Sequence, residues 1–138
     1  MTAFESTTLP LDRTAIAPDG SDVRVLLSFP LASMAHFELA AGCVSNAATH
    51  KTVSEVWYVL SGLGQMWRKQ HAGVAPGQQE QIVTLLPGVC LTIPQGTHFQ
   101  FCAAHEQALC VLGVTTPAWP GDDEAQLVEG PWTPSARA

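Results

Sequence analysis

Short apolar runs alternate with turn signals along most of the chain. The turns are marked by Gly and Pro, as in Pro18-Asp19-Gly20, Ser61-Gly62 and Pro87-Gly88. The runs between them are rich in Val, Leu, Ile, Phe and Trp, residues that favour strands. They predict eight strands, at 23–29, 34–40, 53–60, 65–69, 81–86, 89–93, 98–102 and 108–115. Short strands at this regular spacing are typical of an all-β sandwich or barrel.

No window of the sequence shows a capped helix with a 3.6-residue apolar period. About eight strands fit a jelly roll, in which two antiparallel sheets face each other. The 138 residues are enough for one domain. We expect its core strands to span about 21–116, with a hairpin loop at 70–79 and an irregular tail at 117–138. The tail carries Trp119 and Trp132, which either anchor it on the barrel or on a neighbouring subunit, or belong to a partly disordered end.

The first of two stretches with candidate chemistry holds His50 and Glu55, and the following strand ends at Gly62. Side chains alternate between the two faces of a strand. If Glu55 points into the barrel, Trp57 therefore points the same way. His50 lies at an odd separation from Glu55, so both side chains point inward only if residues 51–54 contain a bulge or begin outside the strand.

The second stretch starts at Gly88 and continues through Pro94-Gln95-Gly96 to His98 and Phe99. In the strand that follows, Phe99 and Phe101 share one face and His98 lies on the other. An apolar inner face is the cheaper arrangement, because a buried imidazole needs a partner. A turn just before His98 would instead bring its ring over the mouth of the barrel. Both placements stay open.

Together the two stretches, over residues 42–102, resemble the two motifs of the cupin superfamily. The resemblance implies an all-β, cupin-type double-stranded β-helix (jelly-roll barrel) with a small-molecule site inside the barrel. In metal-binding cupins the first motif supplies His-x-His and a Glu, and the second motif supplies another His. This chain has Ala48 in place of the first histidine and Phe99 in place of the last, with His98 one residue early.

His50 and Glu55 are the best candidates for catalytic residues and for metal ligands. Two or three imidazoles with one carboxylate suit a single divalent ion such as Fe, Zn, Mn or Ni, and the alternative is no metal at all. His98 is a further candidate ligand. His36 is a weak one, because Phe37 beside it should face the core and turn His36 away. We expect the substrate pocket to be lined by Trp57, Phe99 and Phe101.

Three functions stay open for such a barrel. The first is a metal-dependent enzyme, oxygenase-, isomerase- or lyase-like, in which the metal polarises a substrate oxygen or activates dioxygen or water. The second is a metal-free enzyme in which His50 and Glu55 form an acid–base pair. The third is a non-catalytic module that binds or senses an apolar small molecule. The fold alone does not decide between them.

The composition narrows the range of partners. Twelve Asp and Glu against six Lys and Arg give a net charge of −6, which argues against nucleic acid or an anionic membrane surface. No run approaches the ~20 apolar residues needed to cross a bilayer. The chain start shows no basic-then-apolar block, so we expect no signal peptide and a cytoplasmic location. The four cysteines show no zinc-like spacing, and we expect them to be small buried residues.

Charged residues make up only 13% of the chain, below the usual share of about a quarter. A surface with so little charge suggests that a second subunit covers part of it. An open sheet edge also needs covering. We therefore expect a homodimer joined through sheet faces or edges, with a small molecule as the other partner.

Overall fold

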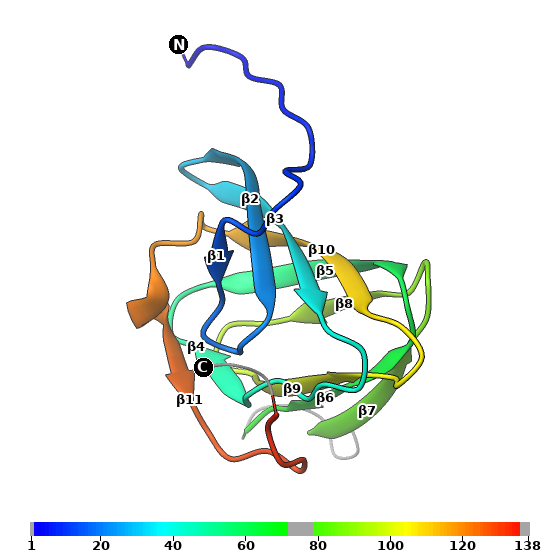
Figure 1. Ribbon diagram of the computed structural model, residues 1–138. Coiled ribbons are helices and arrows are strands. Elements are labelled where there is room, and N and C mark those ends of the chain that lie inside the picture. Colours follow the sequence, from blue (N-terminus) through cyan, green and yellow to red (C-terminus); the bar gives the residue numbers. More distant parts are fainter. Residues whose placement is uncertain (1, 72–78, 136–138) are drawn as a thin grey trace.

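The computed structural model describes residues 2–71 and 79–135, and the chain path is shown in Figure 1. Most of the predicted loop at 70–79 and the last three residues of the predicted tail lie outside these ranges. The described strands are β1 (Ala15–Ile16), β2 (Asp22–Phe29), β3 (Ala32–Leu39), β4 (Ala48–His50), β5 (Ser54–Ser61), β6 (Gly64–Lys69), β7 (Glu80–Leu85), β8 (Cys90–Ile93), β9 (His98–Ala103), β10 (Leu109–Thr116) and β11 (Ala125–Leu127). One 3-10 turn, η1 (Asp122–Glu124), precedes β11.

All eight strands predicted from the apolar runs are present, and none of their ends differs by more than two residues. The all-β prediction is therefore confirmed. The sequence pattern missed β1, β4 and β11, which have only two or three residues each. Runs that short carry too few apolar positions to show a period of two. No helix in the described part of the chain is long and apolar enough to cross a membrane.

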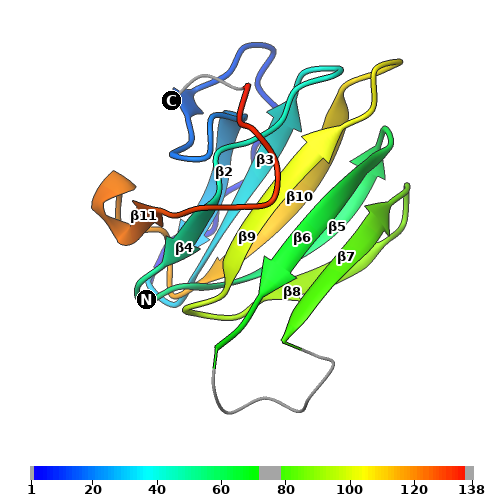
Figure 2. The same cartoon turned by 90° about the horizontal axis from the view of Figure 1, so that it is seen from below.

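The strands form two antiparallel sheets that face each other as two layers (Figure 2). Sheet A has the order β1-β2-β3-β10-β5-β8, and sheet B has the order β11-β4-β9-β6-β7. The longest contacts in sheet A join β10 to both β3 and β5. In sheet B, β9 lies between β4 and β6. Neighbours in the sheets are therefore often far apart in the sequence, as a jelly roll requires.

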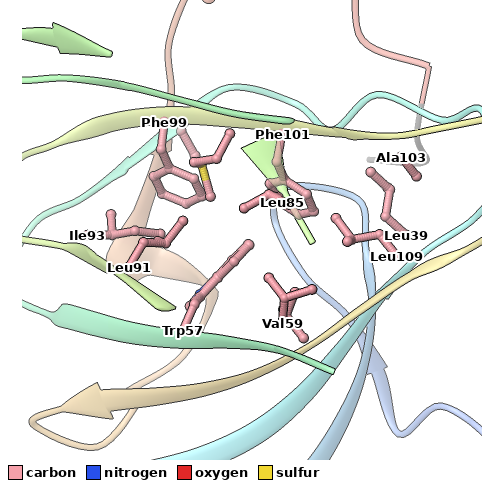
Figure 3. Close-up of a cluster of buried hydrophobic side chains, with 13 residues drawn as sticks. Leu39, Trp57, Val59, Leu85, Leu91, Ile93, Phe99, Phe101, Ala103 and Leu109 are labelled. Atoms are coloured by element: carbon pink, nitrogen blue, oxygen red, sulfur yellow. The ribbon is translucent and has the colours of Figure 1, made fainter. Parts of the chain in front are cut away.

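Large apolar side chains from both sheets fill one part of the space between the layers (Figure 3). Trp57 of β5 lies at the centre, with its ring stacked on Phe37 and set edge-on to Phe101. The alternation of β9 places Phe99 and Phe101 inward, each 1% exposed. Burying an aromatic side chain of this size stabilises a fold by roughly 1.5–3 kcal/mol. The core thus holds the two sheets at a fixed separation beside the remaining, unfilled space.

The C-terminal tail has more regular structure than the irregular segment predicted. Strand β11 pairs with β4, where Ala125 lies opposite His50. Farther along, the Trp132 backbone N–H donates to Gln100 Oε1 at 3.1 Å, and Gln100 Nε2 donates to the Trp132 carbonyl at 2.8 Å. Gln100 points to the outer face of sheet B yet is fully buried, because the tail covers it. This pairing satisfies the buried amide.

The cysteines follow the prediction only in part. All four are free thiols, and three are partly buried. Cys90 is exposed, contrary to expectation. It lies opposite Tyr58 in the β5–β8 pairing, and both side chains point to the outer face of sheet A. An apolar pattern alone does not reveal which face of an edge strand is covered.

Two glycines at the ends of β5 and β7 have the same backbone conformation in different surroundings. Gly62 has a φ of +94°, and a Cβ there would lie 2.4 Å from the Ala108 carbonyl oxygen. Gly88 has a φ of +90° and open space around it. We expect Gly88→Ala to lower the free energy of unfolding by about 1 kcal/mol, the cost of a left-handed backbone.

Gly62→Ala should cost several times more, because a carbonyl oxygen of the neighbouring backbone would have to move as well. Urea unfolding of both variants measures the difference, with Gly88→Ala as the matched control. Equal losses in the two variants would show that the close approach at Gly62 has no energetic weight.

Candidate functional site

A cavity of about 330 Å³ lies between the sheets beside the aromatic core. Its walls come from β1, β2 and β3 of sheet A, from the ends of β4 and β5, and from the C-terminal segment at 118–125. The inward residues at this end of the sandwich are small, among them Ala35, Ala48 and Gly113. Because large side chains are missing here, the two layers enclose a space within the usual range for a small-molecule pocket.

His50 and Glu55 both face this cavity, on opposite sheets. His50 ends β4 in sheet B, and Glu55 lies near the start of β5 in sheet A. The connection at 51–53 is a turn outside both strands, so the odd separation of the two residues does not send them to opposite sides. His50 Nδ1 and Glu55 Oε2 are 3.8 Å apart. The turn thus turns two neighbours in sequence into two facing walls.

The Glu55 carboxyl is buried, with 5% of its surface exposed. Burial raises the pKa of Glu55 to about 8, the nearby Asp19 carboxyl adds to the rise, and the Trp57 side chain opposes it. No Lys or Arg is found among the described residues that line the cavity. A carboxyl without a cation in an apolar space favours its neutral form. Glu55 is therefore a protonated acid at neutral pH.

His50 is held between two aromatic rings. The centroid of its ring lies 5.2 Å from that of Phe99 and 4.9 Å from that of Trp119, both set edge-on. Burial lowers the pKa of His50 to about 4, although the Glu124 carboxylate opposes the shift. Nδ1 has no hydrogen-bond partner among the described residues. His50 therefore offers a neutral, unpaired imidazole nitrogen at neutral pH.

A row of polar side chains crosses sheet A under the cavity. Glu55 lies opposite Thr115, Thr115 opposite Ser33, and Ser33 opposite Ser28 in the strand register. The Ser33 and Thr115 hydroxyl groups are hydrogen-bonded to each other. Residues opposite one another on adjacent strands share a face. The row gives the floor of an otherwise apolar cavity several uncharged hydrogen-bonding groups.

Asp19 is a second buried acid in the cavity wall, from the turn between β1 and β2. Its carboxylate accepts hydrogen bonds from the Ser21 N–H at 2.8 Å and from the Ser21 hydroxyl at 2.6 Å. Burial raises the pKa of Asp19, and the two bonds from Ser21 reduce the rise. The bonds fix the carboxyl within its own turn, so Asp19 shapes the charge of the wall.

The C-terminal segment closes the cavity over His50. The Trp119 N–H donates to the Ser33 hydroxyl at 3.0 Å, which fixes the start of the segment on β3. Its other end is fixed by Glu124, which accepts hydrogen bonds from the Thr52 N–H at 2.6 Å and from the Thr52 hydroxyl. Thr52 belongs to the turn between His50 and Glu55. The same contact therefore positions the turn and the segment above it.

The structure divides the predicted pocket residues. Phe99 lines the cavity. Trp57 and Phe101 do not, and the expectation that they form its walls needs correction. Both belong to the solid core, where Trp57 packs against Phe37 and Phe101. Inward direction alone could not separate the filled part of the barrel from the hollow part.

His98 and His36 are not brought together with His50 and Glu55, which corrects their prediction as metal ligands. His98 lies on the outer face of sheet B, and its Nε2 is 3.2 Å from Nε2 of His71. Strand alternation puts it there because Phe99 occupies the inner face. His36 is buried on the outer face of sheet A, opposite Arg24 and Leu112 in the register. The apolar faces of both strands have won the inner positions.

The side chains present do not fit a metal centre. Among the described residues, no group of three or more His, Cys, Asp and Glu side chains is arranged to hold a metal ion. Ala48 and Phe99 stand at ligand positions implied by the cupin resemblance, and both line the cavity. They lie directly opposite each other in the β4–β9 pairing. His50 and Glu55 are thus left without the further ligands that such a site requires.

Sequence reasoning missed Asp19 and Trp119 as parts of the cavity wall. Asp19 stands in a Pro-Asp-Gly turn, where an Asp has an ordinary structural explanation. Trp119 follows the last long strand, and its isolated aromatic ring was a signal that the tail is anchored. Which surface it anchors on depends on the long-range packing of the tail, and a local pattern does not contain that information.

Comparison with known proteins finds no matching family profile and no matching curated protein. Solved structures do match. KdgF from Halomonas sp. has a TM-score of 0.66 at 16% identity, over 84% of this chain and 97% of that chain. Pac13 from Streptomyces, described as a nucleoside dehydratase, has a TM-score of 0.65 at 16% identity, over 90% of this chain and 92% of that one. A double-stranded β-helix protein from Klebsiella pneumoniae has a TM-score of 0.64 at 16% identity, over 91% and 100%.

The fold is that of the cupin superfamily. The predicted double-stranded β-helix is thus confirmed. At these identities the likeness shows the fold alone, and the chemistry rests on this chain's own residues.

The burial of Glu55 makes a prediction about stability. A carboxyl whose pKa is raised from 4.5 to about 8 by folding stabilises the fold fully at low pH, and this contribution is lost as the pH rises toward 8. Glu55→Gln removes the loss, because an amide does not ionise. We expect the variant to gain stability relative to the wild type between pH 5 and pH 9, by several kcal/mol, since one pKa unit corresponds to about 1.4 kcal/mol.

Urea unfolding of both proteins at the two pH values measures this gain. Glu106→Gln, at an exposed position, is the matched control and should show no such gain. A difference between wild type and Glu55→Gln that stays constant with pH would mean that Glu55 is ionised inside the folded protein.

Proposed function

We propose that this chain is a metal-independent acid–base enzyme of the lyase type that removes water from an uncharged small molecule in the cavity. The observation that carries the proposal is the pairing of a protonated carboxyl with a neutral, unpaired imidazole nitrogen 3.8 Å away, both facing one enclosed space. An acid and a base in opposite protonation states are what concerted proton transfer needs.

The two groups have distinct roles in this reaction. His50 takes a proton from the carbon next to a carbonyl group of the substrate. The bond between the neighbouring carbon and its hydroxyl oxygen breaks, and Glu55 donates its proton to the leaving oxygen, so that water forms. His50 is left protonated and Glu55 ionised. Because their atoms are 3.8 Å apart, a proton returns from His50 to Glu55 once the product leaves, and the starting state is restored.

The charge of the cavity limits the substrate class. The described lining holds the acids Asp19, Glu55 and Asp122 and no Lys or Arg. An anionic ligand would lie buried near these acids without a counter-ion, which is costly in an apolar space. The Ser33 and Thr115 hydroxyl groups and the aromatic rings of Phe37, Phe99 and Trp119 suit an uncharged molecule with an apolar or aromatic part.

One structure with the same fold supports a reaction of this class. Pac13 is described as a nucleoside dehydratase. Loss of water is therefore a chemistry that a small cupin barrel can carry out. The likeness says nothing of the substrate of this chain, because the two sequences are only 16% identical.

Removing either group should abolish turnover while leaving binding. We expect His50→Gln and Glu55→Gln each to lower kcat by about 100-fold or more, the usual contribution of a positioned acid or base. The probes are aryl-substituted β-hydroxy ketones, whose loss of water gives conjugated ketones that absorb in the near ultraviolet. His36→Gln, at a buried histidine outside the cavity, is the matched control and should keep full activity.

Two further measurements bear on the same assignment. Activity should be highest between about pH 4 and pH 8, falling above as Glu55 loses its proton and below as His50 gains one. It should survive prolonged treatment with a chelator. Activity that returns only when Fe(II), Zn(II) or Mn(II) is added would refute a metal-independent reaction.

The charge of the ligand should matter more than its size. We expect an aryl β-hydroxy ketone to raise the melting temperature progressively with concentration, and the aryl β-hydroxy acid of the same skeleton to leave it unchanged at pH 7. The reason is that the acid is an anion in a wall without cations. A thermal-shift titration of the two compounds measures this, and equal stabilisation by both would contradict the proposed substrate class.

The dominance of apolar groups in the lining favours one second candidate, a module that binds an apolar molecule without converting it. In that case the ketones bind saturably, and neither loss of water nor exchange of a carbon-bound hydrogen with deuterium from heavy water is seen by NMR. The two candidates differ in this exchange, because a base that abstracts a proton exchanges it with solvent even when no net reaction follows.

A further inference from the structure

The outer face of sheet A is apolar and uncovered at its centre. Val56 and Tyr58 of β5 are 52% and 46% exposed, and Leu60 on the same strand is 43% exposed. They point outward because Trp57 and Val59 between them fill the core. The opposite positions on β10 and β8 continue the surface and are Leu112, Val114, Cys90 and Thr92. We call these residues the outer patch.

The outer patch contains no charged side chain, although the chain carries a net charge of −6. Monomeric proteins seldom leave such a contiguous apolar surface open to water. Two copies of an acidic chain repel each other if their charged surfaces meet. They can associate through this patch, because contact there keeps the carboxylates at the rim and in water.

The N-terminal arm, residues 2–13, is a second uncovered apolar element. Figure 1 shows it projecting from the barrel beyond β2 and β3. Its base is fixed by Arg24, whose Nε and Nη2 donate to the carbonyl groups of Pro10 and Leu11. The side chain of Phe4 is 100% exposed and that of Leu11 is 91% exposed. Within one chain, these apolar side chains contact no surface that buries them.

A groove lies between this arm and the outer patch. It has a volume of about 290 Å³ and is lined by Ala3 and Glu5 of the arm, by Leu27 and Phe29 of β2, and by Met34 and Val114. Val114 belongs to the outer patch, so the groove and the patch are continuous. Ser28, Ser33 and Met34 line both this groove and the catalytic cavity. A partner in the groove would therefore adjoin the cavity wall.

We propose that a second copy of this chain covers the outer patch, with the arm of each copy lying on the other. A two-fold axis makes such a contact self-complementary: each chain supplies an exposed arm and an uncovered apolar surface, and each receives the partner's. The patch and the arm together reach the roughly 20 residues per partner of a standard interface. This dimer does not depend on the proposed acid–base chemistry.

Sedimentation equilibrium tests the proposal. The wild type should have twice the 14.7 kDa mass of one chain at micromolar concentration. Val56→Asp places a charge at the centre of the patch and should give the monomer mass. Ile82→Asp is the matched control, since Ile82 is an equally exposed strand residue on sheet B, and it should remain dimeric. Deletion of residues 2–9 should weaken association by roughly 10-fold or more.

The exposed thiol of Cys90 gives a second readout that does not depend on mass. It lies in the patch, so a thiol reagent should modify it more slowly in the wild type than in Val56→Asp, with Cys90→Ser identifying its share of the signal. Circular dichroism shows that the variants are folded. A monomeric wild type at about 100 µM, a Val56→Asp protein that stays dimeric, or equal labelling of the two would each overturn the proposal.

Discussion

The burial of the Glu55 carboxyl without a cation is the constraint on which the site depends. Glu55 is 5% exposed and no Lys or Arg lines the described cavity, so the carboxyl is neutral at physiological pH. A buried ionised carboxylate would cost several kcal/mol. The fold tolerates Glu55 there because the polar row of Thr115 and Ser33 runs beside it. Its protonation, the exclusion of anions and its capacity to donate a proton all follow from the same burial.

The space between the sheets is filled at one end and hollow at the other, and side-chain size decides which. Trp57, Phe101 and their neighbours pack the filled end. At the hollow end the inward positions carry small residues, and Gly113 is the clearest case. A Cβ on Gly113 would lie 2.6 Å from the Phe37 ring and 3.2 Å from Glu55 Oε1. The cavity therefore exists because this sequence places small residues where β3 and β10 pass Glu55.

The sequence was sufficient for the strands that fill the core and insufficient for the elements that complete the site. Eight strands could be placed because apolar residues and turn residues alternate regularly, and the parity of β9 correctly put Phe99 inward. The strand β4, which carries His50, has three residues and no period of its own. Trp119 reaches the cavity only through long-range contacts with Ser33 and His50. Its packing, and with it one whole wall, could not be derived from local pattern.

The departures from the cupin metal motif and the unusual acidity of Glu55 have one physical origin. The ligand positions that the resemblance implies are held by Ala48 and Phe99, which face each other across β4 and β9 and line the cavity. A bound divalent cation would hold a neighbouring carboxyl ionised. With apolar groups in those positions, desolvation acts on Glu55 unopposed and its pKa rises. The same two replacements therefore remove a metal centre and create a buried acid, so a cupin barrel that lacks the ligands still holds groups able to transfer protons.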